Sequence, residues 1–160
     1  MELVVSFALF AILVTVFLER TLYYQEYAEK TAMEMTVANM RSGLRYKVAD
    51  LIMNNRMSEI ATLADENPIT WLSSRPENYL GEYDSVPGAV TKGKWYYDRT
   101  AHELVYTLNH WRHFVPSGGE DFAVRYRCMP IKADQKEDAK GASPQTWVTL
   151  AQMQRYTWLR

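Results

Sequence analysis

The sequence predicts an α+β fold in which a long N-terminal helix packs on a small antiparallel β-sheet. Three observations predict it: an uncharged apolar run at residues 3–18, a stripe of apolar residues at helical spacing after it, and short aromatic and β-branched runs in the second half of the chain. With 160 residues, the chain is long enough for one modest folded unit and too short for two. The single cysteine, Cys128, excludes an intramolecular disulfide, and we expect it to be a small buried residue.

The apolar run reads LVVSFALFAILVTVFL, and we expect the hydroxyls of Ser6 and Thr15 to bond back to the helix backbone. Sixteen helical residues span about 24 Å, slightly less than the ~30 Å hydrocarbon core of a bilayer. A core helix of a globular protein needs a polar face, and this run has none. A secretory signal peptide has basic residues before its apolar core and a small-residue cleavage site after it, which this sequence lacks. We therefore expect residues 1–18 to lie in a membrane or in a bundle of like helices.

Glu2 directly precedes the run and has two interpretations. A carboxylate at a helix N-terminus is favourable by about 0.5 kcal/mol, so Glu2 is first interpreted as an acid that caps the helix near the membrane surface. An unpaired carboxylate inside a bilayer costs several kcal/mol. The second interpretation is therefore that a positively charged partner neutralises Glu2.

Glu2-Leu3-Val4-Val5, with the apolar run and amphipathic helix that follow, resembles the N-terminal methylation segment of type IV pilins and type II secretion pseudopilins. The resemblance implies cleavage after a glycine by a prepilin peptidase, methylation of the exposed amine, and pairing of Glu2 with the amine of a neighbouring subunit. It also implies a subunit-assembly surface in the first part of the helix, made of Glu2, Leu3, Val4, Val5, Phe7, Leu9, Phe10 and Leu13.

Two features depart from the family pattern. The basic leader with its glycine is missing, so we interpret Met1 as an internal start, a truncation or a misassigned initiation codon. The kinking proline that many members carry after the apolar run is absent, and Glu19 and Arg20 stand near its place. The missing proline predicts a straighter helix or a minor subunit.

Residues 19–66 form the expected amphipathic continuation of the helix. Good helix formers dominate up to Met53, without a proline. The apolar stripe is too short for a coiled coil and comprises Met33, Val37, Met40, Leu44, Val48 and Leu51. The opposite face carries Glu26, Lys30, Glu34, Arg41, Arg45 and Asp50, and we expect an ion pair between Glu26 and Lys30. The helix should end or bend at residues 54–56, and a short helix should follow from Met57 to Ala64. We interpret the methionines as core filler: Met33, Met35, Met40, Met53 and Met57.

Residues 67–160 form the expected loop and sheet domain. The stretch 67–88 is rich in Pro, Gly, Ser and Asn and predicts a loop pinned by Trp71, Leu72, Tyr79 and Leu80. Runs at 94–98 and 103–109 predict a β-hairpin, a third strand is expected at 122–128, and a final strand at 146–150. We expect a mobile loop at 132–144 and a surface tail at 152–159.

Alternation places the side chains of the second hairpin strand: Leu104, Tyr106 and Leu108 share one face, and Val105 and Thr107 the other. The phrase W-Y-Y-D-x-x-x-x-E-L-V-Y is similar to the first hairpin of pseudopilin domains, in which the sheet lies against the long helix. The phrases N-P-I-x-W-L and P-E-N-Y-L-G-E also look like segments that follow the helix in some pseudopilins and minor pilins.

The sequence carries no recognisable catalytic, phosphate-binding or metal motif, and we expect no enzymatic activity, no cofactor and no metal. His110 and His113 stand three residues apart at a strand end, which places their rings on opposite faces and favours surface or loop histidines over a zinc site. An irregular acidic group with interspersed lysines favours a solvated loop over a calcium site; it comprises Asp134, Glu137 and Asp138.

From the resemblance we expect a structural subunit of a type IV pilus or type II secretion pseudopilus. Its expected location is the bacterial inner membrane, crossed once, with the C-terminal domain in the periplasm, or the cell surface within a filament. Its expected partners are other pilin or pseudopilin subunits, the inner-membrane assembly platform and the lipid bilayer.

Two alternatives remain open. A DNA-uptake minor pilin would bind single strands through a basic and aromatic tail made of Trp147, Arg155, Tyr156, Trp158 and Arg160. Beyond Leu18, however, 18 basic residues balance 18 acidic ones, whereas nucleic-acid binding favours a basic excess. The other alternative is a non-polymerising signal-anchor protein with a periplasmic binding domain.

Overall fold

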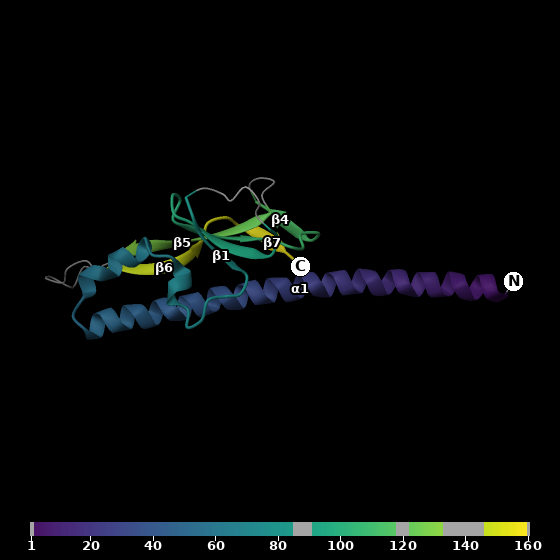
Figure 1. Ribbon diagram of the computed structural model, residues 1–160, viewed down its shortest axis with the longest axis horizontal. Helices are drawn as coiled ribbons and strands as arrows, with labels where there is room; N and C mark the ends of the chain where they lie inside the picture. Colours follow the sequence, from purple (N-terminus) through teal and green to yellow (C-terminus); the bar gives the residue numbers. More distant parts are fainter. Residues whose placement is uncertain (1, 85–90, 118–121, 133–145, 160) are drawn as a thin grey trace.

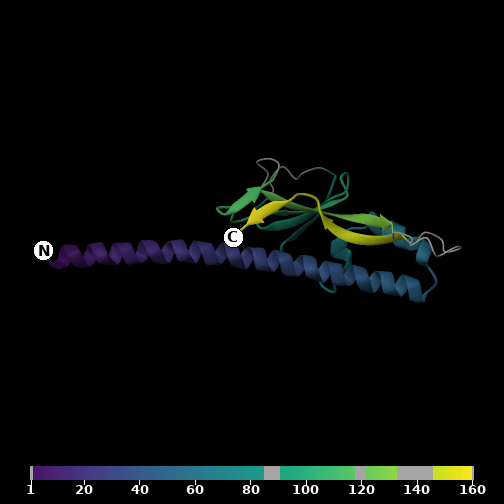
Figure 2. The same cartoon turned by 180° about the vertical axis from the view of Figure 1, so that it is seen from behind.

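The computed structural model describes residues 2–84, 91–117, 122–132 and 146–159. One helix, α1 (Glu2–Met53), lies along the molecule, and a β-sheet packs against its second half. We call the sheet and the segments packed with it the head; Figures 1 and 2 show that the first half of α1 protrudes beyond the head, and that the last strand ends beside the middle of the helix. The expected α+β arrangement of a long helix on a small sheet is confirmed.

The 52 residues of α1 form one uninterrupted helix, as the absence of proline predicts. All six residues of the predicted apolar stripe are buried, from Met33 to Leu51. Ser6 Oγ donates to Glu2 O at 3.0 Å and Thr15 Oγ1 donates to Ala11 O at 2.9 Å, which confirms the expected back-bonding of both hydroxyls. The stripe therefore fixes which face of α1 meets the sheet.

The helix ends at the predicted place. Asn55 takes a left-handed conformation with φ 56°, which asparagine adopts more readily than most residues, and Arg56 N–H closes the turn by donating to Leu51 O at 2.8 Å. Two 3₁₀ helices follow, η1 (Met57–Ala64) and η2 (Pro68–Trp71). The short helix expected at 57–64 is present, with 3₁₀ rather than α geometry.

Five strands form the main sheet in the order β1-β2-β3-β5-β6. They are β1 (Tyr79–Tyr83), β2 (Lys94–Asp98), β3 (Glu103–Thr107), β5 (Ala123–Lys132) and β6 (Thr146–Gln152). The predicted hairpin is confirmed as β2 and β3. Strand β5 contains the predicted third strand except for Phe122, β6 contains the predicted final strand, and both continue beyond their predicted C-terminal ends.

The sheet is not wholly antiparallel, because β1 pairs with β2 in parallel. The prediction of a loop over 67–88 is therefore wrong for this strand and for η2. Gly81, at φ 124°, lies where the register shifts between Tyr79 and Glu82, and glycine accepts this backbone conformation without strain. Pro76 and Gly81 gave the segment the composition of a loop.

Two short strands, β4 (Phe114–Pro116) and β7 (Tyr156–Trp158), form a second antiparallel sheet at the end of the head nearest the protruding helix (Figure 1). The expected surface tail at 152–159 is therefore wrong, since Trp158 is 3% exposed and packs in the core. Trp158 contacts Phe114 edge to face, with 5.7 Å between ring centroids. Most of the loop expected at 132–144 lies outside the described residues.

The main core lies between α1 and the sheet. Leu104, Tyr106 and Leu108 face it, whereas Val105 packs on the opposite side of the sheet, as the alternation predicts. Met33 and Met40 fill the core beside Trp95. The prediction of core filler is wrong for the other three methionines, since exposed positions on α1 and η1 hold Met35, Met53 and Met57.

Gly43 lies at a close approach of η2 to α1. A Cβ at this position would lie 2.5 Å from Trp71 O and 2.9 Å from Trp71 Cβ. The Trp71 backbone is fixed in place, because Leu72 N–H closes η2 by donating to Ile69 O. Glycine at residue 43 therefore allows the contact between the two helices.

We predict that Gly43→Ala destabilises the protein by about 1 kcal/mol, because ~1–3 kcal/mol of overpacking exceeds the ~1 kcal/mol gain in helix propensity. Chemical denaturation of the full chain in detergent measures the change. Ser42→Ala, at the exposed neighbouring residue, is the control. Equal or higher stability of Gly43→Ala would contradict the close approach.

Candidate assembly surface

The first part of α1 exposes its apolar side chains to solvent. Leu3 is 83% exposed, and none of the predicted assembly residues that follow it is buried by the head. Glu2 lies in the first turn and is also exposed. Among the described residues, this helix is long and apolar enough to cross a membrane.

The eight predicted assembly residues share a segment, not one face. From Glu2 to Leu13 they extend over about 17 Å of helix and point in all directions around it. Apolar side chains exposed on all sides are unfavourable in water and stable only in lipid or against other apolar helices. The arrangement therefore favours several simultaneous neighbours over a single docking partner.

Glu26 binds the head to α1 about 12 Å beyond Leu18, the end of the uncharged run. Its carboxylate is 2% exposed and accepts three hydrogen bonds. His113 N and Trp158 Nε1 each donate to Oε1 at 2.9 Å, and His113 Nδ1 lies 2.7 Å from Oε2. The prediction of Glu26 on the polar face, paired with Lys30, is therefore wrong; Lys30 Nζ donates to Trp158 O at 2.8 Å.

Glu29, one turn further along, binds the other end of the same loop. Its Oε1 accepts from Asn109 N at 2.6 Å and from the Tyr106 hydroxyl at 3.1 Å. Its Oε2 accepts from His110 N at 2.9 Å and lies 2.7 Å from His110 Nδ1. We call Glu26, Glu29 and the 109–113 loop the carboxylate clamp.

The carboxylate clamp stabilises the ionised form of Glu26. Burial alone raises the pKa of this carboxyl, but the hydrogen bonds from His113 and Trp158, with the charge of His113, outweigh burial and hold the pKa below its ordinary value of 4.5. Each bond forms between the helix and a strand end or loop that is distant in sequence. The clamp thus fixes the head at a defined height on α1.

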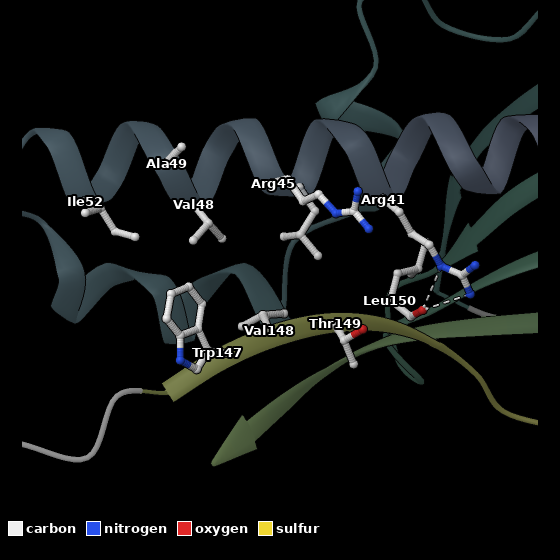
Figure 3. A pocket seen from close by; sticks show the side chains of 10 residues that line it. Arg41, Arg45, Val48, Ala49, Ile52, Trp147, Val148, Thr149 and Leu150 are labelled. Atoms are coloured by element: carbon white, nitrogen blue, oxygen red, sulfur yellow. Dashed lines mark hydrogen bonds between the residues drawn. The ribbon is translucent and has the colours of Figure 1, made fainter. Parts of the chain in front are cut away.

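A groove of about 350 Å³ lies at the other end of the head, between α1 and the edge strand β6 (Figure 3). Trp147 stands toward Val48 and Ile52 in Figure 3, and Arg41 donates to Leu150 O at 3.4 Å. Trp147 therefore lies far along the head from Trp158. The described residues of the predicted basic and aromatic tail do not form one stacking surface, since Trp158 is buried and Trp147 lies in this distant groove; Arg160 lies outside the described residues.

Within the described parts of the chain, no group of His, Cys, Asp and Glu could hold a metal ion. His110 and His113 lie in a loop, as predicted, but the prediction that their rings point to opposite faces is wrong, because both rings face α1 and bind Glu29 and Glu26. Asp134, Glu137 and Asp138 lie outside the described residues. Burial raises the pKa of the Cys128 thiol to about 12, which leaves it protonated and unreactive at neutral pH.

Sequence reasoning missed the carboxylate clamp, although a signal for it existed. Glu26 and Glu29 are three residues apart on a helix, and His110 and His113 are three residues apart in a loop. Matching spacings of complementary groups predict two adjacent contacts. The loop runs in the opposite direction to the helix, so Glu26 pairs with His113 and Glu29 pairs with His110.

Comparisons with protein-family models, curated proteins and solved structures find no match to this chain.

We predict that Glu26→Gln destabilises the head by about 2–4 kcal/mol, since the amide replaces an acceptor with a donor opposite buried donors. Chemical denaturation of the full chain in detergent, followed by near-ultraviolet circular dichroism, measures the change. Glu34→Gln, at an exposed residue of α1, should shift stability by less than ~0.5 kcal/mol. Equal effects of the two substitutions would show that the clamp adds no stability.

The lowered pKa of Glu26 predicts that the stability of the head depends on pH. Because the folded-state pKa of Glu26 is lowered, its stabilising contribution is present above the unfolded-state pKa and is lost as the pH falls through the folded-state pKa. Denaturation midpoints measured from about pH 6 down to about pH 3 should therefore fall, and Glu26→Gln should flatten this slope. An unchanged slope in the variant would assign the acid sensitivity to other groups.

Proposed function

We propose that this protein is a pilin-like structural subunit that assembles through residues 1–18 into a type IV pilus or type II secretion pseudopilus. The observation that carries the proposal is the exposed, uncharged part of α1 from Leu3 to Leu18, which we call the rod. The rod continues without a break into the part of α1 that packs against the head. The resemblance of Glu2-Leu3-Val4-Val5 to the methylation segment of pilins supports the same assignment.

The exposed rod needs an apolar environment before and after assembly. Before assembly the bilayer supplies it, because every backbone polar group of a helix is bonded internally. In a filament, neighbouring rods replace the lipid through close side-chain packing. Glu2 becomes stable inside such a bundle when a neighbour's N-terminal amine supplies the opposite charge, since an isolated buried carboxylate costs several kcal/mol.

The carboxylate clamp suits the head to this role. It fixes the head on the same helix that makes the lateral contacts, so the packing of rods also sets the spacing of heads. In this proposal the head lies in the periplasm, and the partners are other pilin or pseudopilin subunits and the inner-membrane assembly platform. The protein acts through assembly rather than catalysis.

We predict that Glu2→Leu and Glu2→Gln leave the chain in the membrane but reduce its crosslinked oligomers at least tenfold, since a lost buried charge pair costs about 3–5 kcal/mol. In-cell crosslinking with the native neighbouring subunits measures the oligomers, and membrane fractionation measures insertion. Ser6→Ala, one turn away, is the control. Normal oligomers in both Glu2 variants would contradict the charge pair, and a wild-type chain that crosslinks only as a monomer would identify a signal-anchor protein.

A further inference from the structure

The 109–113 loop of the head reaches the level at which the uncharged run of α1 ends. A hollow of about 300 Å³ is lined both by Glu19 and Leu22 of the helix and by Trp111 and Arg112 of the loop. The helix rises 1.5 Å per residue, so Leu22 lies about 6 Å beyond Leu18. The headgroup layer on each side of a bilayer is itself about 5–7 Å thick. If the run spans the bilayer, as the proposed function requires, this loop lies at headgroup depth.

The side chains at this level are those that membrane interfaces prefer. Lys92 Nζ lies 3.9 Å from the ring centroid of Trp111, and the ring of Phe122 lies 5.5 Å from that of Trp111. Phe122 is a large apolar side chain and is 43% exposed. Tryptophan rings with adjacent basic groups concentrate where the acyl chains meet the headgroups.

The charges of the same surface favour phosphate. Among the described residues at this level, Arg20, Lys92 and Arg112 are exposed basic residues, and Glu19 is an exposed acid. The two further carboxylates nearby, Glu26 and Glu29, are bonded within the carboxylate clamp. The net positive charge is attracted to anionic lipid, at about 1 kcal/mol for each basic residue near the surface.

We propose that these five residues form an interfacial surface that seats the head on the phospholipid headgroups of the membrane that α1 enters: Arg20, Lys92, Trp111, Arg112 and Phe122. Arg112, beside the hollow, donates to a lipid phosphate, and the ring of Trp111 lies at the boundary with the acyl chains. Because the carboxylate clamp fixes this loop on α1, the contact sets the height and tilt of the head above the bilayer before assembly. This inference rests on the membrane anchorage in the proposed function.

Tryptophan quenching in lipid tests the contact. The full chain is reconstituted into vesicles of phosphatidylcholine and phosphatidylglycerol that carry a nitroxide on a fraction of the headgroups. We expect Trp111→Phe to remove at least half of the headgroup quenching, because the ring of Trp111 meets the headgroups in this proposal, whereas Trp158, which bonds Glu26 beside the hollow, is buried. The control is Trp147→Phe in the distant groove, which should leave the quenching unchanged.

A second measurement does not depend on the Trp111 variant folding. A bimane label at Asn109→Cys, beside the hollow, should be quenched at least threefold more than one at Ser58→Cys beyond the end of α1, while the buried Cys128 stays unlabelled. Equal quenching at the two labelled positions, or unchanged quenching in Trp111→Phe, overturns the lipid contact. Flotation separates the two hypotheses. A chain that floats with the vesicles but lacks the quenching supports membrane anchorage by α1 and contradicts the headgroup contact. A chain that does not float contradicts both.

Discussion

The structure depends on one constraint, which is that a single helix has to be stable in two environments. Up to Leu18 its exposed apolar side chains need apolar surroundings, and further along it packs one face against a protein core. Nothing in α1 relieves this demand by a kink, because the 52 residues contain no proline and the backbone stays helical to Met53. The apolar surface changes from the whole circumference to one stripe near residue 19. The head can therefore pack against one face of the helix only beyond residue 19, and the buried residues of α1 begin at Glu26.

The carboxylate clamp is the part of the head that meets this boundary. Beyond the exposed segment of α1, the first carboxylates that the head binds are those of Glu26 and Glu29. Both accept hydrogen bonds from backbone N–H groups, and both contact a histidine ring nitrogen. Charge-assisted bonds of this kind are stronger than neutral ones and specify geometry as well as energy. The clamp thus turns a helix that could slide or rotate against an apolar sheet into one with a fixed register.

Periodicity predicted most of the fold. The spacing of Met33, Val37 and Met40 fixed the buried face of α1, and alternation in Leu104, Tyr106 and Leu108 fixed the inner face of the hairpin. Strand β1 was missed because Gly81 and Pro76 resemble loop residues; Gly81 lies at the register shift within the strand, and Pro76 precedes the strand. Strand β7 was not predicted because a strand of three residues is too short to show a recognisable alternation.

The site was predictable only where it depends on composition. The exposed apolar segment is visible in the sequence, whereas Glu26 looked like a solvated acid because burial of a charge depends on partners 87 and 132 residues away. Local patterns carry no information on such partners, and only the matched spacing of the two acids and two histidines hinted at them.

A disulfide scan along the exposed part of α1 tests whether subunits assemble through this helix. Single cysteines are placed in turn at each residue from Leu3 to Leu18, and the full chain is oxidised in the membrane of its own cell. We predict disulfide-linked subunits at positions on more than one side of α1, because its exposed apolar side chains point in all directions and several neighbouring helices would surround it. The absence of linked subunits at every position would contradict assembly through α1.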